Sequence, residues 1–141
     1  MKFVLSFYGT RGDVEPGVAV GRELVRRGHD VCMAVSPDLV GFAESAGPAA
    51  VPCGPDVRVW QDVNRDFWAR FLRKFWRNFW RVGELKDLLR EDWRLLAQCW
   101  DDVSTTLLTH AKDADLLFTG VLGEEAAGNV AEHYGIPLAT L

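Results

Sequence analysis

The sequence opens with a short apolar run, a glycine-containing turn and a helix-forming segment, and this order constrains the fold more than any other feature. Residues 3–7 (FVLSF) indicate a buried strand. Residues 16–28 indicate a helix, with Pro16 near its first turn and Gly28 at its end. A strand that leads directly into a helix is the repeating unit of α/β folds, whose ligands bind at the carboxyl ends of the strands.

The remaining sequence continues this alternation of strands and helices. Further strands are predicted at residues 30–35, 49–52, 115–119 and 136–141, and further helices at about 36–46 and 123–134. The sequence from about residue 61 to 111 has the pattern of helices alone and interrupts the alternation. We therefore expect residues 1–141 to form one Rossmann-like domain, a parallel sheet flanked by helices, with a helical insertion at about 61–111. Because the sequence stops in a strand, we expect the domain to continue in the full protein.

The turn at residues 9–16 is the first candidate site. Gly9 and Gly12 allow the backbone to approach a ligand, and helix-start amides hold anions or hydroxyl oxygens. Arg11 can pair with a carboxylate or phosphate, whereas Asp13 can accept a proton from an alcohol. The spacing is not that of a dinucleotide fingerprint, and Ser36 stands where an acidic residue would follow the second strand, which disfavours NAD. Helix capping by Asp13 is an equally simple interpretation of the same residues.

A resemblance narrows these alternatives. The segment GTRGDVEP at 9–16 resembles the N-terminal signature of a glycosyltransferase group. That group includes sterol glucosyltransferases, the glycosyltransferases of glycopeptide antibiotics and mycobacterial lipid glycosyltransferases. The similarity extends over residues 1–55 and about 111–141, through the segments at 18–24, 27–31, 42–47 and 126–137.

The resemblance implies the N-terminal, acceptor-binding half of a two-domain GT-B enzyme. Such an enzyme transfers a hexose from a UDP- or TDP-sugar, held mainly by a C-terminal domain that this sequence lacks, to a hydroxyl of a lipid, sterol or other hydrophobic acceptor. The implied reaction inverts the anomeric centre without a metal or cofactor. Asp13 is the implied general base. Together with the sheet edge at which the fourth strand ends, this predicts acceptor-binding residues at Gly9, Thr10, Arg11, Gly12, Thr119 and Gly120. We expect this chain alone to be inactive.

A second candidate site lies in the helical insertion. Residues 65–81 contain six basic residues and one acidic residue, although the whole chain carries a net charge of −4. At helical spacing the aromatic and basic side chains separate onto opposite arcs. This separation favours contact with a lipid acceptor or an anionic membrane surface. The predicted contact residues are Trp68, Phe71, Phe75, Trp76, Phe79, Trp80, Arg73 and Arg77.

Two alternatives remain open for this helix. It can be a core helix with a solvated basic face, or it can make the chain a non-catalytic lipid- or membrane-binding module. Nucleic acid is not an expected partner, because the rest of the chain is acidic. The spacing of the three histidines and three cysteines predicts no metal site. No signal peptide and no apolar run long enough to span a bilayer are recognisable, so we expect a cytoplasmic protein that contacts the inner face of the membrane peripherally.

Overall fold

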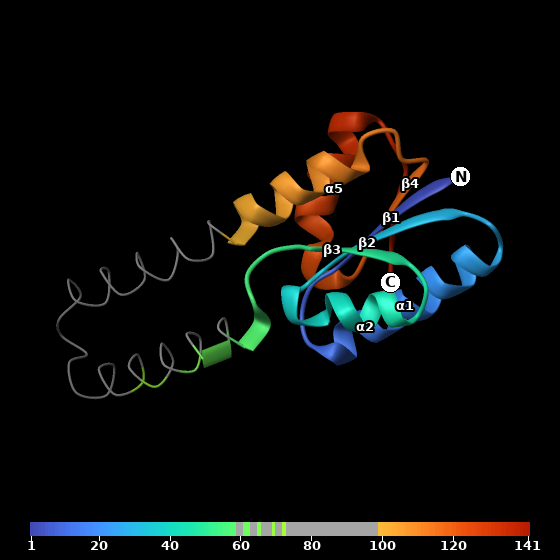
Figure 1. Ribbon diagram of the computed structural model, residues 1–141. Helices are drawn as coiled ribbons and strands as arrows, with labels where there is room; N and C mark the ends of the chain where they lie inside the picture. The colour runs from blue at the N-terminus through green and yellow to red at the C-terminus, as the bar shows by residue number, and fades with distance from the viewer. Residues whose placement is uncertain (59–60, 63–64, 66–68, 70–71, 73–98) are drawn as a thin grey trace.

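A single parallel sheet forms the centre of the molecule (Figure 1). The computed structural model describes residues 1–58, 61–62, 65, 69, 72 and 99–141. Within these residues the sheet has five strands in the order β3-β2-β1-β4-β5, each parallel to its neighbours. The strands are β1 (Lys2–Phe7), β2 (Asp30–Val35), β3 (Ala49–Pro52), β4 (Leu116–Thr119) and β5 (Leu138–Thr140). The predicted Rossmann-like sheet is confirmed, and each predicted strand overlaps an observed one.

Helices cover both faces of this sheet (Figure 1). One face is covered by α1 (Arg11–Arg26) and α2 (Val40–Ser45), and the other by the helical residues 99–111 and α5 (Glu124–Tyr134). Two short 3-10 helices, η1 (Pro37–Leu39) and η2 (Val121–Gly123), follow the carboxyl ends of β2 and β4. Among the described residues, no helix combines the length and apolarity needed to cross a bilayer.

The face under α1 is packed by large side chains from β1 and β2. Leu5 and Phe7 of β1 and Met33 of β2 are buried there. Helix α1 approaches closely because Gly17 faces the Phe7 ring, where an added Cβ would lie 2.4 Å from a ring carbon. A residue larger than glycine at position 17 would therefore push α1 away from the sheet.

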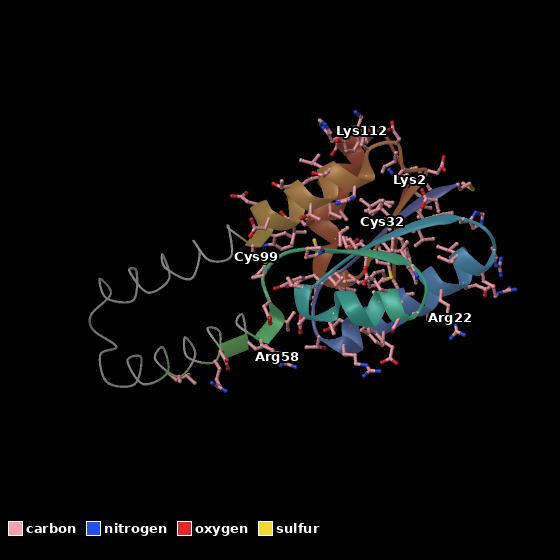
Figure 2. All side chains as sticks on the ribbon, viewed as in Figure 1. Lys2, Arg22, Cys32, Arg58, Cys99 and Lys112 are labelled. Atoms are coloured by element: carbon pink, nitrogen blue, oxygen red, sulfur yellow. The ribbon has the colours of Figure 1, made fainter. Side chains whose placement is uncertain are left out.

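The opposite face has smaller side chains. Val4 of β1 and Leu117 of β4 pack there with Leu107 from the helical residues 99–111 and with the alanines of α5. Figure 2 shows side chains filling the space between the sheet and its helices, while charged residues such as Arg22 lie on the outside. Strand β1 contributes buried side chains to both cores and is the middle strand of the sheet, so it lies at the centre of the fold.

Helix α1 begins at Arg11 rather than at the predicted position 16. Thr10 is the N-cap residue, and the carboxylate of Asp13 accepts a hydrogen bond from the Thr10 backbone amide (N···Oδ2 2.8 Å). This interaction satisfies one of the amides left free at a helix start. Pro16 lies inside the helix, beyond its first turn, where it has no N–H to donate to the carbonyl of Gly12. The placement of Pro16 at the first turn was therefore wrong.

The strand order places a crevice at the carboxyl ends of β1 and β4. From β1 the chain proceeds through α1 to β2 on one side, whereas β4, which pairs with β1 on the other side, is reached only after β3. This reversal of direction is a topological switch point, where α/β sheets bind ligands. The turn after β1 and the segment after β4 therefore lie at the same edge, as predicted for Thr119 and Gly120.

Candidate functional site

The turn after β1 has a backbone shape that requires glycine at its centre. Gly9 has a φ of +135°, and a Cβ added there would lie 2.7 Å from Oδ2 of Asp13. The buried hydroxyl of Ser36, at the end of β2, accepts a hydrogen bond from the Gly9 amide and lies at hydrogen-bond distance from its carbonyl, both at 3.2 Å. The turn is thus fixed from the neighbouring strand, and only glycine leaves room for the Asp13 carboxylate.

Asp13 caps the start of α1 through one of its two carboxylate oxygens. Its Oδ2 accepts hydrogen bonds from the backbone amide and from the hydroxyl of Thr10, at 2.8 and 2.7 Å. Among the described residues, no hydrogen bond is made to Oδ1, and the side chain is exposed. One oxygen therefore anchors the start of α1, and the other is accessible to a ligand. Capping and proton acceptance are compatible in this geometry.

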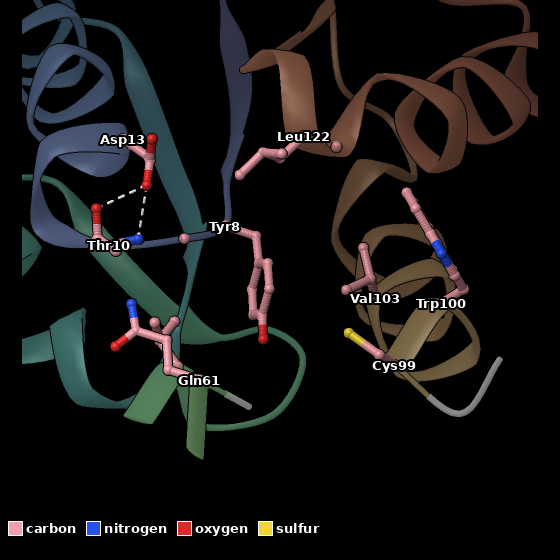
Figure 3. Close-up of a pocket in the computed structure, with 11 residues that line it drawn as sticks. Tyr8, Thr10, Asp13, Gln61, Cys99, Trp100, Val103 and Leu122 are labelled. Atoms are coloured by element: carbon pink, nitrogen blue, oxygen red, sulfur yellow. Dashed lines mark hydrogen bonds between the residues drawn. The ribbon is translucent and has the colours of Figure 1, made fainter. Parts of the chain in front are cut away.

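A pocket of about 260 Å³ lies beside Asp13 (Figure 3). Its lining comes from the turn after β1, from the segment after β3, from the helical residues 99–111 and from η2. The lining residues are Tyr8, Gly9, Thr10, Asp13, Val57, Gln61, Cys99, Trp100, Val103, Leu122 and Gly123. Most of these side chains are apolar or aromatic, which is typical of sites for hydrophobic small molecules.

Tyr8 stands in the middle of this pocket in Figure 3. Its hydroxyl donates a hydrogen bond to the carbonyl of Pro55 (3.1 Å), and burial raises the pKa of the phenol well above its ordinary value. Gly54 makes room for the ring, because an added Cβ there would lie 2.9 Å from a Tyr8 ring carbon. Tyr8 is therefore a neutral wall of the pocket with its polar end already bonded.

Two thiols lie on the same side of the fold as the pocket. Cys99 lines it, whereas Cys53 is buried in the adjoining core, 1% exposed. Burial raises the pKa of Cys53 to about 12, with a further contribution from Cys99. Burial also raises the pKa of Cys99, although a hydrogen bond with Tyr8 acts in the opposite direction. Both thiols are therefore protonated at neutral pH.

A second pocket, of about 280 Å³, shares Tyr8, Asp13 and Leu122 with the first. Its other lining residues are Phe7, Gly12, Pro16, Gly120, Val121 and Leu141. Asp13 thus lies where two pockets meet, between the start of α1 and the segment after β4. A group bound in one pocket and a group bound in the other would both lie near its carboxylate.

Five of the seven residues predicted for catalysis and acceptor binding line one of the two pockets. Gly9, Thr10 and Asp13 line the first pocket, and Gly12 and Gly120 line the second.

Two predicted residues lie outside the lining of both pockets. Arg11 points toward α2, where its guanidinium stacks 4.5 Å from the centre of the Phe42 ring and lies 3.9 Å from Glu15. Thr119 is fully buried, and its hydroxyl lies 3.1 Å from the Ser6 carbonyl. The assignment of these two residues to acceptor binding stays a prediction.

The predicted membrane contacts lie outside the described residues. These are Trp68, Phe71, Phe75, Trp76, Phe79, Trp80, Arg73 and Arg77. Leu72, in the same segment, is described and is 51% exposed. Within the described part of the chain, no group of three or more His, Cys, Asp or Glu residues is arranged to hold a metal ion.

Several pocket residues were not predicted from the sequence. Tyr8 directly follows the first strand, so its place at the carboxyl edge was available as a signal. Gln61, Cys99 and Trp100 carry no such signal, because they reach the pocket from segments far from the turn in the sequence. Their position depends on how the helical residues 99–111 pack on the sheet.

Comparison with known proteins adds the family. Residues 3–99 match the glycosyltransferase family 28 N-terminal domain. The chain belongs to this family. A protein of Mycobacterium tuberculosis, named as an uncharacterized glycosyltransferase, is 48% identical over all 141 residues, which cover 32% of that protein. A sterol 3-beta-glucosyltransferase of Arabidopsis thaliana is 39% identical over 59 residues, 42% of this chain and 9% of that protein.

Solved structures agree with this family membership at the level of the fold. A Streptomyces glycosyltransferase complexed with thymidine diphosphate aligns with a TM-score of 0.64 and 20% identity, covering 99% of this chain and 38% of that one. This chain spans about a third of the length of the mycobacterial relatives it matches. The family 28 domain described here therefore has the architecture of a GT-B N-terminal domain, and its relatives are longer proteins.

Proposed function

We propose that this family 28 domain binds the acceptor in an inverting glycosyltransferase, and that Asp13 is the general base. The observation that carries the proposal is the position of Asp13, whose free Oδ1 lies where an apolar pocket meets a second pocket at the switch point. Carboxylates at such positions serve as proton acceptors when a substrate hydroxyl comes within hydrogen-bond reach.

In the proposed reaction, the acceptor binds in the pocket lined by Tyr8, Trp100 and Val103, with its hydroxyl at Asp13. The hydroxyl proton moves to Oδ1 of Asp13 while the acceptor oxygen forms a bond to the anomeric carbon of the donor. The bond between that carbon and the diphosphate breaks, and the nucleoside diphosphate leaves with the electron pair. Attack from the face opposite the leaving group inverts the anomeric configuration.

The donor is proposed to be a nucleotide sugar, either a UDP- or a TDP-sugar, held mainly by a C-terminal domain of the full-length protein. The thymidine diphosphate complex of the Streptomyces enzyme supports a donor of this class. The second pocket, whose lining includes Gly12, Asp13 and Gly120, offers space for the sugar beside the same carboxylate. No residue is assigned to a metal or cofactor, and metal-independent transfer stays a prediction.

The acceptor is proposed to be a lipid, a sterol or another hydrophobic alcohol. Two observations support this class: the apolar lining of the first pocket, and the similarity of residues in this chain to a sterol glucosyltransferase. A volume of about 260 Å³ lies just below the usual range for drug-sized ligands. It fits a compact ring system or one end of a longer lipid.

The proposal is tested in the full-length protein by the substitution Asp13→Asn. The side-chain oxygen of asparagine can still accept the hydrogen bond from the Thr10 backbone amide. The start of α1 is therefore retained while the proton acceptor is lost. We expect transfer from UDP-glucose or TDP-glucose to 2-naphthol or cholesterol to slow by about 10²–10⁴-fold. The matched control is Glu15→Gln, the same chemical change on an exposed residue of α1 outside both pockets. An unchanged turnover of the Asp13→Asn variant would rule out Asp13 as the general base.

A second candidate function is binding to an anionic membrane surface through residues 65–81. The basic and aromatic composition of the segment and the exposure of Leu72 favour it. We expect the full-length protein to sediment with vesicles containing phosphatidylserine at 50 mM salt, and to be released at 500 mM salt. If the protein does not bind the vesicles at low salt, membrane binding by residues 65–81 is excluded, and the segment belongs to the core or to the wall of the pocket.

A further inference from the structure

The short helix η2 carries two exposed apolar side chains where the two pockets meet. Val121 is 73% exposed and Leu122 is 59% exposed. Leu122 belongs to the lining of both pockets, whereas Val121 belongs to the lining of the second. In Figure 3 the Leu122 side chain extends from its helix toward the side of the pocket that carries Asp13, above the ring of Tyr8. Leu122 therefore lies at the boundary between the two pockets.

Glycines at both ends of η2 hold this helix against the end of the sheet. A Cβ added to Gly120 would lie 3.2 Å from a ring carbon of Phe7, and one added to Gly123 would lie 2.9 Å from the hydroxyl oxygen of Thr119. The Gly123 amide donates a hydrogen bond to the Gly120 carbonyl (3.0 Å), which closes the turn between them. Close packing of the backbone therefore determines where the Leu122 side chain begins.

This boundary also lies beside the proposed general base. Asp13 lines both pockets, and the proposed reaction places the acceptor hydroxyl at its carboxylate and the acceptor body toward Trp100 and Val103. Carbon atoms far from the hydroxyl then occupy the first pocket. A bulky substituent next to the hydroxyl would instead extend toward the boundary, where it meets the branched side chain of Leu122.

We propose that Leu122 is a specificity-determining residue that separates the acceptor pocket from the space for the donor sugar. It selects hydrophobic alcohols and phenols that carry no bulky substituent beside the hydroxyl. This inference rests on the proposed function of the first pocket as the acceptor site. By keeping the acceptor body out of the second pocket, Leu122 leaves that space beside Asp13 to the sugar.

The inference is tested by binding, without any donor, in the full-length protein. The isomers 4-phenylphenol and 2-phenylphenol contain the same atoms, but only the second has a ring beside its hydroxyl. Titration calorimetry should show that wild-type protein binds 4-phenylphenol about 10-fold or more tightly than 2-phenylphenol. Leu122→Ala opens the boundary and is expected to reduce this preference to within about two-fold, chiefly by tightening 2-phenylphenol. Retained binding of 4-phenylphenol shows that the variant is folded.

Two controls separate the boundary from the rest of the segment. Leu122→Met nearly conserves the volume of the side chain and is expected to keep the preference. Val121→Ala shortens the neighbouring exposed side chain in the second pocket and is also expected to keep it. The inference is overturned if wild-type protein binds the two isomers equally, if Leu122→Ala retains the preference, or if Val121→Ala abolishes it as well.

The same experiment distinguishes this inference from the proposed function. If neither isomer binds the wild-type protein, the first pocket is not an acceptor site, and the inference is rejected with it. Loss of the preference in Leu122→Ala, together with normal turnover in Asp13→Asn, would reject Asp13 as the general base and support the selection by Leu122.

Discussion

The two sides of the first pocket are built in opposite ways. The side that carries Thr10 and Asp13 is local: one turn, one helix start and a serine on the adjacent strand determine its geometry. The side that carries Trp100 and Val103 is assembled from a helix about ninety residues farther along the chain. The local side supplies the reactive group, and the distant side supplies shape and hydrophobicity. Chemistry and specificity are therefore separable by mutation.

The largest effect on the local side is expected from Gly9→Ala. A residue other than glycine is strained at a φ of +135°, and its Cβ would displace the Asp13 carboxylate. We expect the free energy of unfolding to fall by about 1–3 kcal/mol and sugar transfer to be lost with it. Urea denaturation measures the first quantity, and a transfer assay measures the second.

Gly12→Ala is the matched control for that substitution. A Cβ at position 12 would meet only the Thr10 hydroxyl oxygen, at 3.8 Å, and alanine favours a helix by up to about 1 kcal/mol over glycine. The stability of Gly12→Ala should therefore equal or exceed that of the wild-type protein. Equal destabilisation by both substitutions would contradict the assignment of a special backbone shape to Gly9.

A smaller effect is expected at the distant side, in the reactivity of its thiols. Cys99 lines the pocket, whereas Cys53 is buried, and burial raises the pKa of each. Because only the thiolate reacts, alkylation of Cys99 by iodoacetamide should be slow at pH 7.5 and faster at pH 9.5. Cys53, with a pKa of about 12, should stay unmodified in the folded protein at both values.

Protection by a ligand sharpens this test. A naphthol bound against Trp100 covers the neighbouring Cys99, so saturating 2-naphthol should slow the alkylation of Cys99 by a few-fold. Mass spectrometry of the peptides separates the two sites. Modification of Cys53 before Cys99 would contradict the burial of Cys53. An undiminished alkylation rate at Cys99 with the ligand bound would contradict binding of the naphthol beside Cys99.

The contrast between the two sides also explains what the sequence could predict. The strand order and the turn followed from alternation and glycine spacing, because these are local patterns repeated along the chain. The start of α1 was misplaced because Pro16 resembles a first-turn proline, whereas the hydrogen bonds between Thr10 and Asp13 begin the helix earlier. Gln61 and Trp100 could not be predicted, since only the packing of distant segments brings them to the pocket.

Arg11 shows the same limit on the local side. Its place in the turn predicts a ligand contact, which stays a prediction, and its guanidinium stacks on Phe42 of α2. The direction of a long side chain depends on which neighbours the fold provides, and α2 supplies an aromatic ring there. Local sequence located the turn but not the orientation of every residue in it.

The central claim is that Asp13 acts in the chemical step rather than in binding or folding. The most direct measurement is therefore kcat and the acceptor dissociation constant of the full-length Asp13→Asn variant, side by side with wild-type protein and Glu15→Gln. The account predicts that kcat falls by at least about 100-fold while the dissociation constant for 2-naphthol stays within about two-fold. A kcat equal to that of Glu15→Gln, or a loss confined to acceptor binding, would contradict it.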